Sequence, residues 1–178
     1  TDKDLASLGV GAVEVVPRRI LGLYDGSEGA DPVYSNLQRY AVMPLNHLGY
    51  QVELHDLREP LPSGILAGRY AGVVVWPNSD SSGGRQGLAP WLERIMAEGI
   101  KVVFLDRFGL PVSSMTRFGL HDLTPTAPAG DVQIEHRDPL VGYEIAPRPR
   151  PSNILPIRVG PQDRSLLVLG SGTETLSD

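Results

Sequence analysis

The sequence predicts a doubly wound α/β domain, in which a mainly parallel sheet is built from strands that alternate with helices. Short apolar runs bounded by loop residues recur along residues 18–111, and such runs are typical of buried parallel strands. Two longer stretches repeat apolar residues at three- and four-residue steps, which is the spacing of an amphipathic helix. The order is strand, helix, strand, strand, helix, strand, as in doubly wound sheets. Right-handed crossovers then predict the strand order 2-1-3-4.

The first half of this core contains two strands and one long helix. Residues 19–24 are apolar between loop residues and predict a buried strand. Residues 32–48 carry an apolar face and predict a helix, which Pro44 should bend or split because proline lacks a backbone N–H. Residues 51–55 alternate apolar and polar side chains, so they predict a strand near the sheet edge with one exposed face.

The second half of the core repeats this pattern with a more buried strand. Residues 61–70 favour a short helix or a turn, and residues 71–76 form the most apolar run, which predicts the central strand. A helix is expected over 88–98 and a strand over 100–105. The buried stripe of that helix should consist of Leu88, Trp91, Leu92, Ile95 and Met96.

The C-terminal third, residues 112–178, is irregular and β-rich. A helix is expected over 112–123. Short strands are expected at 132–136, 154–159 and 165–169. They could complete the sheet or form an added antiparallel patch, and the pattern does not choose between the two. The length of 178 residues suits a single domain, 1–178, around the βαβ core of 18–111, and the polar ends suggest a piece of a larger multidomain protein.

Composition excludes several classes of function. The formal net charge of −5 argues against a basic face for nucleic acid. The chain has no cysteine, which removes disulfides, thiolate metal sites and cysteine nucleophiles. No apolar run reaches the roughly 20 residues that span a bilayer, so no membrane insertion is expected.

The candidate ligand site lies in three loops that follow strands. In open α/β sheets, ligands bind beyond the carboxyl ends of the strands, at the point where the strand order reverses. The polar residues of these loops are Asp25, Ser27, Glu28, Asn78, Asp80, Asp106 and Arg107. They could hold sugar hydroxyls or a flavin phosphate, or the Ser and Asp side chains could simply cap the next helix. Carboxylates that converge there could also catalyse glycoside hydrolysis.

No complete catalytic or metal motif accompanies these loops. The chain lacks the Gly-x-Ser-x-Gly nucleophile elbow, the Walker lysine and the dinucleotide glycine pattern. Its four histidines do not stand at metal-binding spacing, so we expect no catalytic residue, metal or cofactor. Trp76 and Trp91 are expected in the core, although Trp76 lies close to the end of its strand.

Three segments carry a resemblance to a known family. Residues 19–26 (Arg-Ile-Leu-Gly-Leu-Tyr-Asp-Gly), 45–50 (Leu-Asn-His-Leu-Gly-Tyr) and 72–76 (Gly-Val-Val-Val-Trp) resemble the glutamine-amidotransferase-like, flavodoxin-like domain of PelA-type exopolysaccharide-processing proteins. The resemblance covers about half of the chain. Amidotransferases use a cysteine nucleophile after a strand, and here Pro77 and Asn78 follow Trp76, so the resemblance implies the fold without the chemistry.

The resemblance implies a non-catalytic scaffold or interaction domain in biofilm polysaccharide biosynthesis. Such domains lie between a glycoside hydrolase and a polysaccharide deacetylase in one periplasmic chain, so these domains are expected partners. A galactosamine-rich, cationic polymer and secretion proteins are further partners that the resemblance implies. The alternative is a small-ligand or flavin-binding domain.

Overall fold

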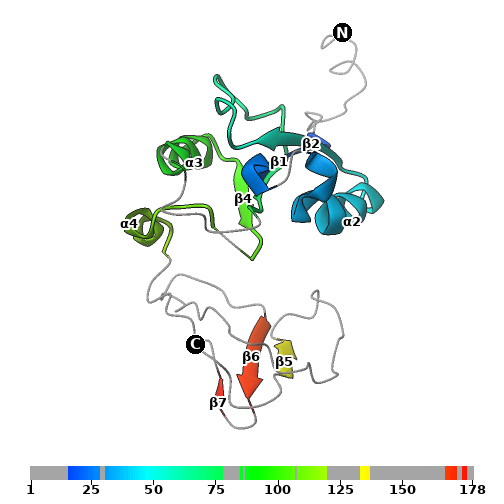
Figure 1. The fold of residues 1–178 in the computed structure, drawn as a ribbon, viewed down its shortest axis with the longest axis vertical. Coiled ribbons are helices and arrows are strands. Elements are labelled where there is room, and N and C mark those ends of the chain that lie inside the picture. The colour runs from blue at the N-terminus through cyan, green and yellow to red at the C-terminus, as the bar shows by residue number, and fades with distance from the viewer. Residues whose placement is uncertain are drawn as a thin grey trace, which may run out of the picture. The chain divides into compact units, whose positions relative to one another are not determined.

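The structure is a computed structural model that describes residues 16–28, 31–77, 85, 87–106 and 108–119, and the backbone of three later strands. The chain divides after Pro111 into two units, 1–111 and 112–178, each of which is described by itself. The first unit is an α/β domain with an all-parallel sheet (Figure 1).

The sheet of the first unit has four strands in the order β2-β1-β3-β4, which confirms the predicted order. The strands are β1 (Arg19–Tyr24), β2 (Gln51–Asp56), β3 (Gly72–Val75) and β4 (Lys101–Phe104). All pair in parallel. β1 and β3 are interior and mostly buried because they are almost wholly apolar. β2 is an edge strand and is only partly buried, as its alternating pattern predicts.

The stretch 32–48 is helical, as predicted, but it is interrupted at Ser35 and not at Pro44. A 3-10 turn, η2 (Pro32–Tyr34), comes first, then a π-helical segment, η3 (Leu37–Val42), and then α2 (Met43–His47). Ser35 separates the turn from the helix, and its hydroxyl accepts the N–H of Gln38 at 3.1 Å, which caps the helix. Pro44 lies just after the π-helical segment, within a helical stretch that continues from η3 into α2.

One face of the sheet packs against η3 and α2. The buried cluster there contains Ile20, Tyr24 and Val74 from the strands and Leu37 and Ala41 from η3. The approach is close at Gly22, because a Cβ there would lie 2.6 Å from Leu37 Cδ2. A glycine is therefore required where η3 crosses β1.

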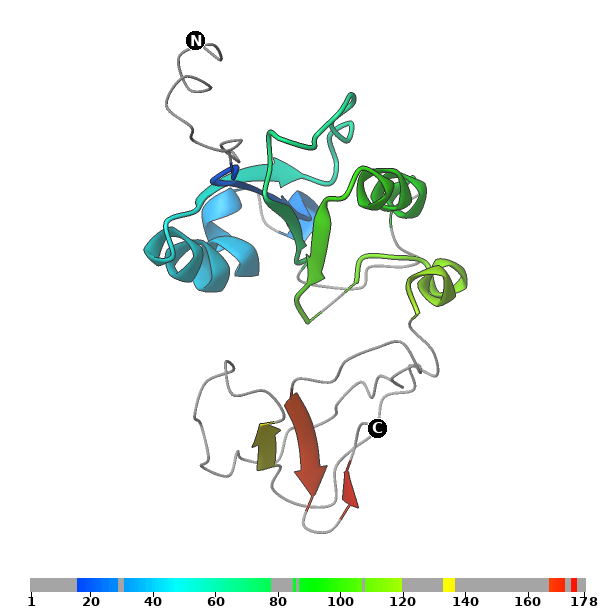
Figure 2. The same ribbon diagram turned by 180° about the vertical axis from the view of Figure 1, so that it is seen from behind.

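The other face belongs to α3 (Leu88–Ala97), which lies on the opposite side of the sheet from α2 (Figures 1 and 2). Its side chains Leu88, Leu92 and Ile95 are fully buried, and Trp91 is buried as predicted. Met96 was expected in this stripe, and that prediction is wrong because Met96 is 47% exposed. Met96 lies in the last turn of α3, next to its C-terminal end at Ala97.

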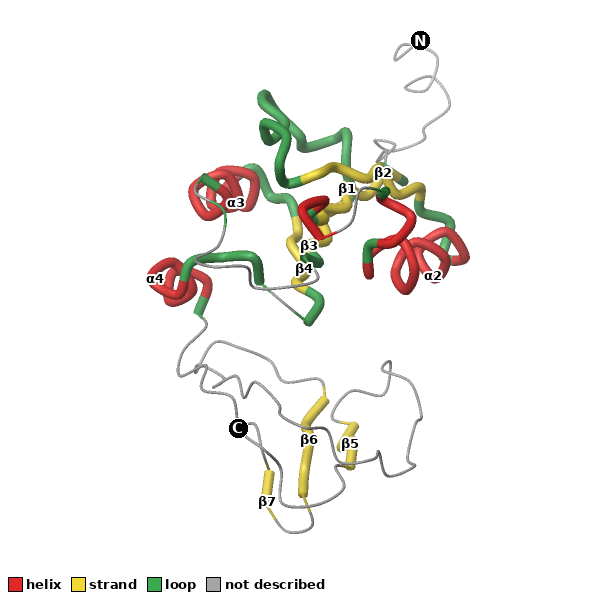
Figure 3. The backbone as a smooth tube through the Cα atoms, viewed as in Figure 1, coloured by secondary structure: helices red, strands yellow, loops and turns green. Residues whose placement is uncertain are grey.

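The long connection between β2 and β3 contains turns and no helix, in agreement with the turn alternative for 61–70 (Figure 3). α3 holds this connection in place. The indole of Trp91 donates to the carbonyl of Pro62 at 2.8 Å, and Glu98 accepts the backbone N–H of Leu66 at 2.9 Å. These bonds satisfy polar groups of a segment that has no ladder of its own.

The second unit begins with α4 (Val112–Met115) and the 3-10 turn η5 (Thr116–Phe118). The helix expected over 112–123 ends early because Gly119 adopts a φ of 74°, a left-handed conformation that stops helices. β5 (Gln133–His136), β6 (Leu167–Ser171) and β7 (Glu174–Thr175) form an antiparallel sheet in the order β5-β6-β7. The strand expected at 154–159 lies outside the described residues.

Candidate functional site

The loop after β1 turns directly after the strand, and a hydrogen bond to its own aspartate stabilises the turn. Asp25 follows the last residue of β1, and its Oδ1 accepts the backbone N–H of Ser27 at 2.9 Å. This contact is typical of Asx turns. Gly26, Ser27 and Glu28 then form the short 3-10 turn η1 (Gly26–Glu28). The aspartate therefore shapes the loop, as the capping alternative predicts.

The loop after β2 is tied to the loop after β1 through Asp56. Its Oδ1 accepts the N–H of Gly26 at 3.1 Å and the N–H of Arg58 at 2.9 Å. Its Oδ2 receives two bonds from the Arg58 guanidinium, from Nε at 2.9 Å and from NH2 at 2.7 Å. A Cβ on Gly26 would collide with the ends of both side chains, so a larger residue there would force the Asp56–Arg58 pair to shift. We call Gly26, Asp56 and Arg58 the loop clasp.

The clasp lowers the pKa of the Asp56 carboxyl below its ordinary value. Burial, the largest single influence, raises it. Hydrogen bonds from the Arg58 side chain, from the Arg58 N–H and from the Gly26 N–H act in the opposite direction, and so does the charge of Arg58. Together these contacts outweigh burial, so they hold Asp56 in its ionised form.

The clasp leaves little room for a phosphate in the β1 loop. A phosphate cradle needs backbone N–H groups that are free to point at the anion. Here the N–H of Gly26 donates to Asp56 and the N–H of Ser27 donates to Asp25. Both donors therefore already face a carboxylate, which would also repel a dianion.

The predicted site residues are only partly placed by the structure. Asp25 and Ser27 lie in the loop after β1, and Glu28 ends η1. Asp106 is exposed after β4 and adopts a φ of 61°, a left-handed conformation. Because Leu105 N–H donates to the Val75 carbonyl at 3.0 Å, Asp106 belongs to the same edge. Asn78, Asp80 and Arg107 lie outside the described residues.

Sequence reasoning missed Asp56 and Arg58, although both lie at this edge. The expected strand ended at His55, so the next residue was not counted among the loop residues at the carboxyl edge. Asp56 is in fact the last residue of β2, paired in register with Tyr24. The general rule for parallel sheets would have selected it once the strand was one residue longer.

An apolar groove runs along the sheet between η3–α2 and the strands β3 and β4, from Gly72 and Lys101 at their amino ends to Trp76 and Leu105 at their carboxyl ends. Its volume is about 580 Å³. The side chains that line it include Tyr40, Pro44, Val74, Trp76 and Val103. We call this surface the aromatic groove. Tyr40 is 55% exposed and Val103 48%, although both are apolar side chains of the domain's own framework.

Tyr40 and Trp76 form the aromatic pair of this groove. Their ring centroids are 6.1 Å apart with an interplanar angle of 37°. Trp76 packs on the core as expected, but it is only half-buried and also lines the groove. Since Leu23 pairs with Val75, Trp76 lies level with Tyr24, and Asp25 follows one residue later.

Charges of both signs lie at the groove and at the carboxyl edge: the Arg39 guanidinium carbon is 5.2 Å from the Tyr40 ring centroid, Lys101 lines the groove, and carboxylates surround Tyr24. Asp31 and Asp56 both act on Tyr24, whose pKa is raised chiefly by burial and then by the charge of Asp56. Arg58 offsets part of this charge. Among the described residues, no cluster of His, Asp and Glu is suited to a metal ion. None of the helices in that part of the chain has the length and hydrophobicity of a membrane span.

Comparisons with known proteins give no match: no family model, no curated protein and no solved structure is significantly similar to this chain.

Proposed function

We propose that this is a non-catalytic, flavodoxin-like interaction domain of a periplasmic exopolysaccharide-processing protein, and that it contacts a galactosamine-rich polymer. The observation that carries the proposal is the Tyr40–Trp76 pair, in which Tyr40 is exposed and Trp76 half-buried, together with the carboxylates Asp25 and Asp56 at the carboxyl edge. The proposal rests on this site and on the resemblance of residues 19–26, 45–50 and 72–76 to PelA-type domains.

The fold supports the flavodoxin-like part of the proposal. The order β2-β1-β3-β4, with helices on both faces, is the order of the first four strands in flavodoxin-like sheets. Ligands of such sheets bind at the carboxyl edge, where the connection reverses direction between β1 and β3. Asp25 and Trp76 lie at this reversal.

The chemistry of the site suits an amino sugar. Aromatic rings such as Tyr40 and Trp76 offer a flat apolar face to a sugar ring, and their π-electrons attract an ammonium group. Carboxylates such as Asp25 attract the same cation over a longer range, and salt screens this attraction. A partly deacetylated galactosamine polymer has both a ring and an ammonium group.

A scaffold role also fits the internal pairing of the carboxyl edge. Asp56 uses both oxygens in hydrogen bonds to Gly26 and Arg58, so this carboxylate serves the shape of the two loops, whereas Asp25 uses Oδ1 for its own turn. The flanking hydrolase and deacetylase domains, and secretion proteins, are the protein partners that the resemblance suggests. The flavin alternative has less support because the N–H groups of Gly26 and Ser27 are already used.

An NMR titration of the isotope-labelled protein with partly deacetylated galactosamine oligosaccharides tests the proposal. We expect saturable shifts at the amides of Asp25, Tyr40, Trp76 and Leu105, and weaker binding at raised salt. Fully acetylated oligosaccharides are the matched control and should bind more weakly, because they lack the ammonium group. Shifts spread over the surface, or none at millimolar ligand, would contradict polymer binding by this domain.

A further inference from the structure

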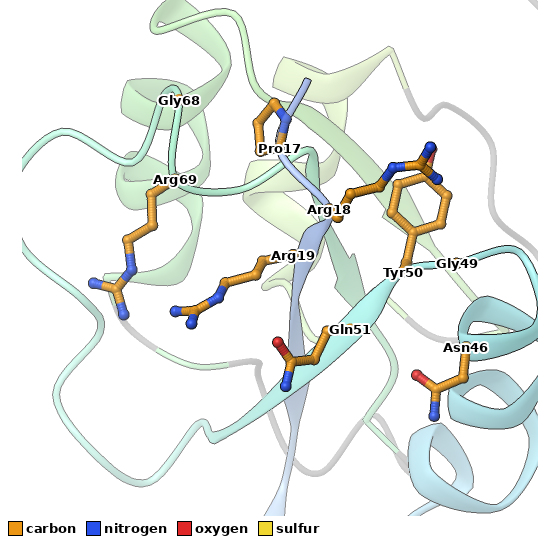
Figure 4. A pocket seen from close by; sticks show the side chains of 9 residues that line it. All are labelled: Pro17, Arg18, Arg19, Asn46, Gly49, Tyr50, Gln51, Gly68 and Arg69. Carbon is orange, nitrogen blue, oxygen red and sulfur yellow. The ribbon is translucent and has the colours of Figure 1, made fainter. Parts of the chain in front are cut away.

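A second cleft lies at the opposite, amino-terminal edge of the sheet (Figure 4). Its volume is about 500 Å³. It is formed by the residues before β1, the first residue of β2, the end of α2 and the turn before β3. The polar side chains that line it are Arg18, Arg19, Asn46, Gln51 and Arg69.

Two arginines of this cleft share one carboxylate. Arg19 NH1 lies 3.9 Å from Glu53 Oε2, and Arg69 NH2 lies 3.3 Å from Glu53 Oε1. Each guanidinium has five N–H donors, so one contact to Glu53 uses only a small part of them. Both arginine side chains are more than half exposed, at 54% and 53%. Their charge therefore exceeds what Glu53 neutralises.

Three polar side chains of the cleft extend toward the same side. In Figure 4 the side chains of Arg69, Arg19 and Gln51 lie in a row with their polar ends toward the same side. Arg18 turns the other way and stacks over the Tyr50 ring, with its guanidinium carbon 5.9 Å from the ring centroid. In the part of the chain that the structure describes, no carboxylate pairs with Arg18.

We propose that this cleft binds a phosphate group between Arg19 and Arg69, with Gln51 as an additional donor. A guanidinium fork matches the oxygens of a phosphate, which can accept two parallel bonds from each arginine. Glu53 offers two oxygens and one charge, whereas a phosphate dianion offers four oxygens and nearly two charges. Phosphate therefore competes with Glu53 for the same donors.

This competition makes Glu53 an internal regulator of the site. Removal of its charge should leave both guanidinium groups without their carboxylate and raise their affinity for an external anion. The backbone of β2 holds Glu53 level with Leu21 of β1, so its carboxylate stays within reach of both guanidinium groups. The site is expected to be weak in the native chain and stronger in Glu53→Gln.

The test is an NMR titration of the whole chain with inorganic phosphate at constant ionic strength, with acetate as the second probe. We expect saturable shifts at the amides of Arg19, Gln51, Gly68 and Arg69 with phosphate, and at least fivefold weaker binding of acetate, which offers a single charge. Shifts that sodium chloride reproduces, or equal affinities for phosphate and acetate, would overturn the assignment.

Variants separate the cleft from general surface charge. The double variant Arg19→Gln, Arg69→Gln should weaken phosphate binding about tenfold or more, and Glu53→Gln should strengthen it severalfold. Arg39→Gln is the matched control, because Arg39 is an exposed arginine outside the cleft. If Arg39→Gln weakens binding as much as the double variant, or if Glu53→Gln does not strengthen it, the proposal is wrong.

Discussion

The two edges of the parallel sheet are charged in different ways. At the carboxyl edge, Asp25 and Asp56 accept backbone N–H groups of their own loops. At the amino edge, Arg19 and Arg69 contact the side chain of Glu53 and remain more than half exposed. The carboxylates that bond to the backbone shape the loops. The two arginines contact the flexible Glu53 side chain, and Arg69 also lies over the Tyr70 ring at 4.8 Å; their exposed contacts to Glu53 can be exchanged for a ligand.

This difference predicts where substitutions cost stability and where they change binding. Loss of the part-buried bond from Gly26 to Asp56 leaves a backbone N–H without its acceptor, whereas an exposed ion pair contributes little to stability. Substitutions at the carboxyl edge should therefore lower the free energy of unfolding, and substitutions at the amino edge should change anion affinity.

The largest expected loss of stability follows removal of the clasp carboxylate. Asp56→Ala leaves the Gly26 N–H without its acceptor and the Arg58 guanidinium without its partner. We expect the free energy of unfolding to fall by about 2 kcal/mol, as for other hydrogen bonds to charged groups. Urea denaturation checks this value. A change below about 0.5 kcal/mol would show that the clasp is dispensable.

The second prediction concerns Gly26, whose position allows the clasp to close. In Gly26→Ala the new methyl group would occupy the space of the Asp56 and Arg58 side chains. We expect a loss of about 1 to 2 kcal/mol, because overpacking forces the neighbours to shift. In the Asp56→Ala background the same change should cost much less, since the clash is already gone. Full additivity of the two changes would contradict a shared clasp.

The third prediction is a pH dependence that belongs to the carboxyl edge. The folded pKa of Asp56 is lowered, while the unfolded value is about 3.9. Its contribution to stability is thus fully present above about pH 4 and is lost as the pH falls through the folded pKa. Urea titrations between about pH 7 and pH 3 should show a smaller acid-induced loss in Asp56→Ala than in the native chain. Parallel curves would contradict the assignment.

The smallest expected change in stability is at the amino edge. Arg19→Gln with Arg69→Gln removes two exposed contacts to Glu53. We expect the free energy of unfolding to change by no more than about 0.5 kcal/mol. The same urea experiment compares this variant directly with Asp56→Ala. A loss as large as that of Asp56→Ala would mean that these arginines, too, are needed for the fold.

Much of the parallel core could be predicted from the sequence, because short apolar runs that alternate with amphipathic helices pack as a parallel sheet covered by helices. The edge position of β2 followed from its alternation, and the strand order followed from crossover handedness. The π-helical segment Leu37–Val42 could not be predicted, since periodicity does not distinguish close helix types. The prediction that Met96 is buried was wrong because apolar character alone does not specify which face of the helix a residue occupies.

The candidate site was less predictable because it depends on contacts between distant segments. Gly26 and Asp56 are thirty residues apart, and the local sequence of neither loop predicts their hydrogen bond. Trp76 was placed in the core from its strand, but its exposure depends on how η3 and α2 cover the sheet. Asp25 was correctly placed at the carboxyl edge, since it directly follows a buried strand.

The most direct test of the central claim is the affinity of partly deacetylated galactosamine oligosaccharides for the native chain, Tyr40→Ala and Tyr34→Ala, measured by calorimetry. Tyr34 is also exposed, at 67%, but does not line the aromatic groove, so it is the matched control. We predict about tenfold weaker binding for Tyr40→Ala, as for loss of one stacking ring, and native affinity for Tyr34→Ala. Equal affinities for all three proteins would contradict a polymer-binding role for the groove.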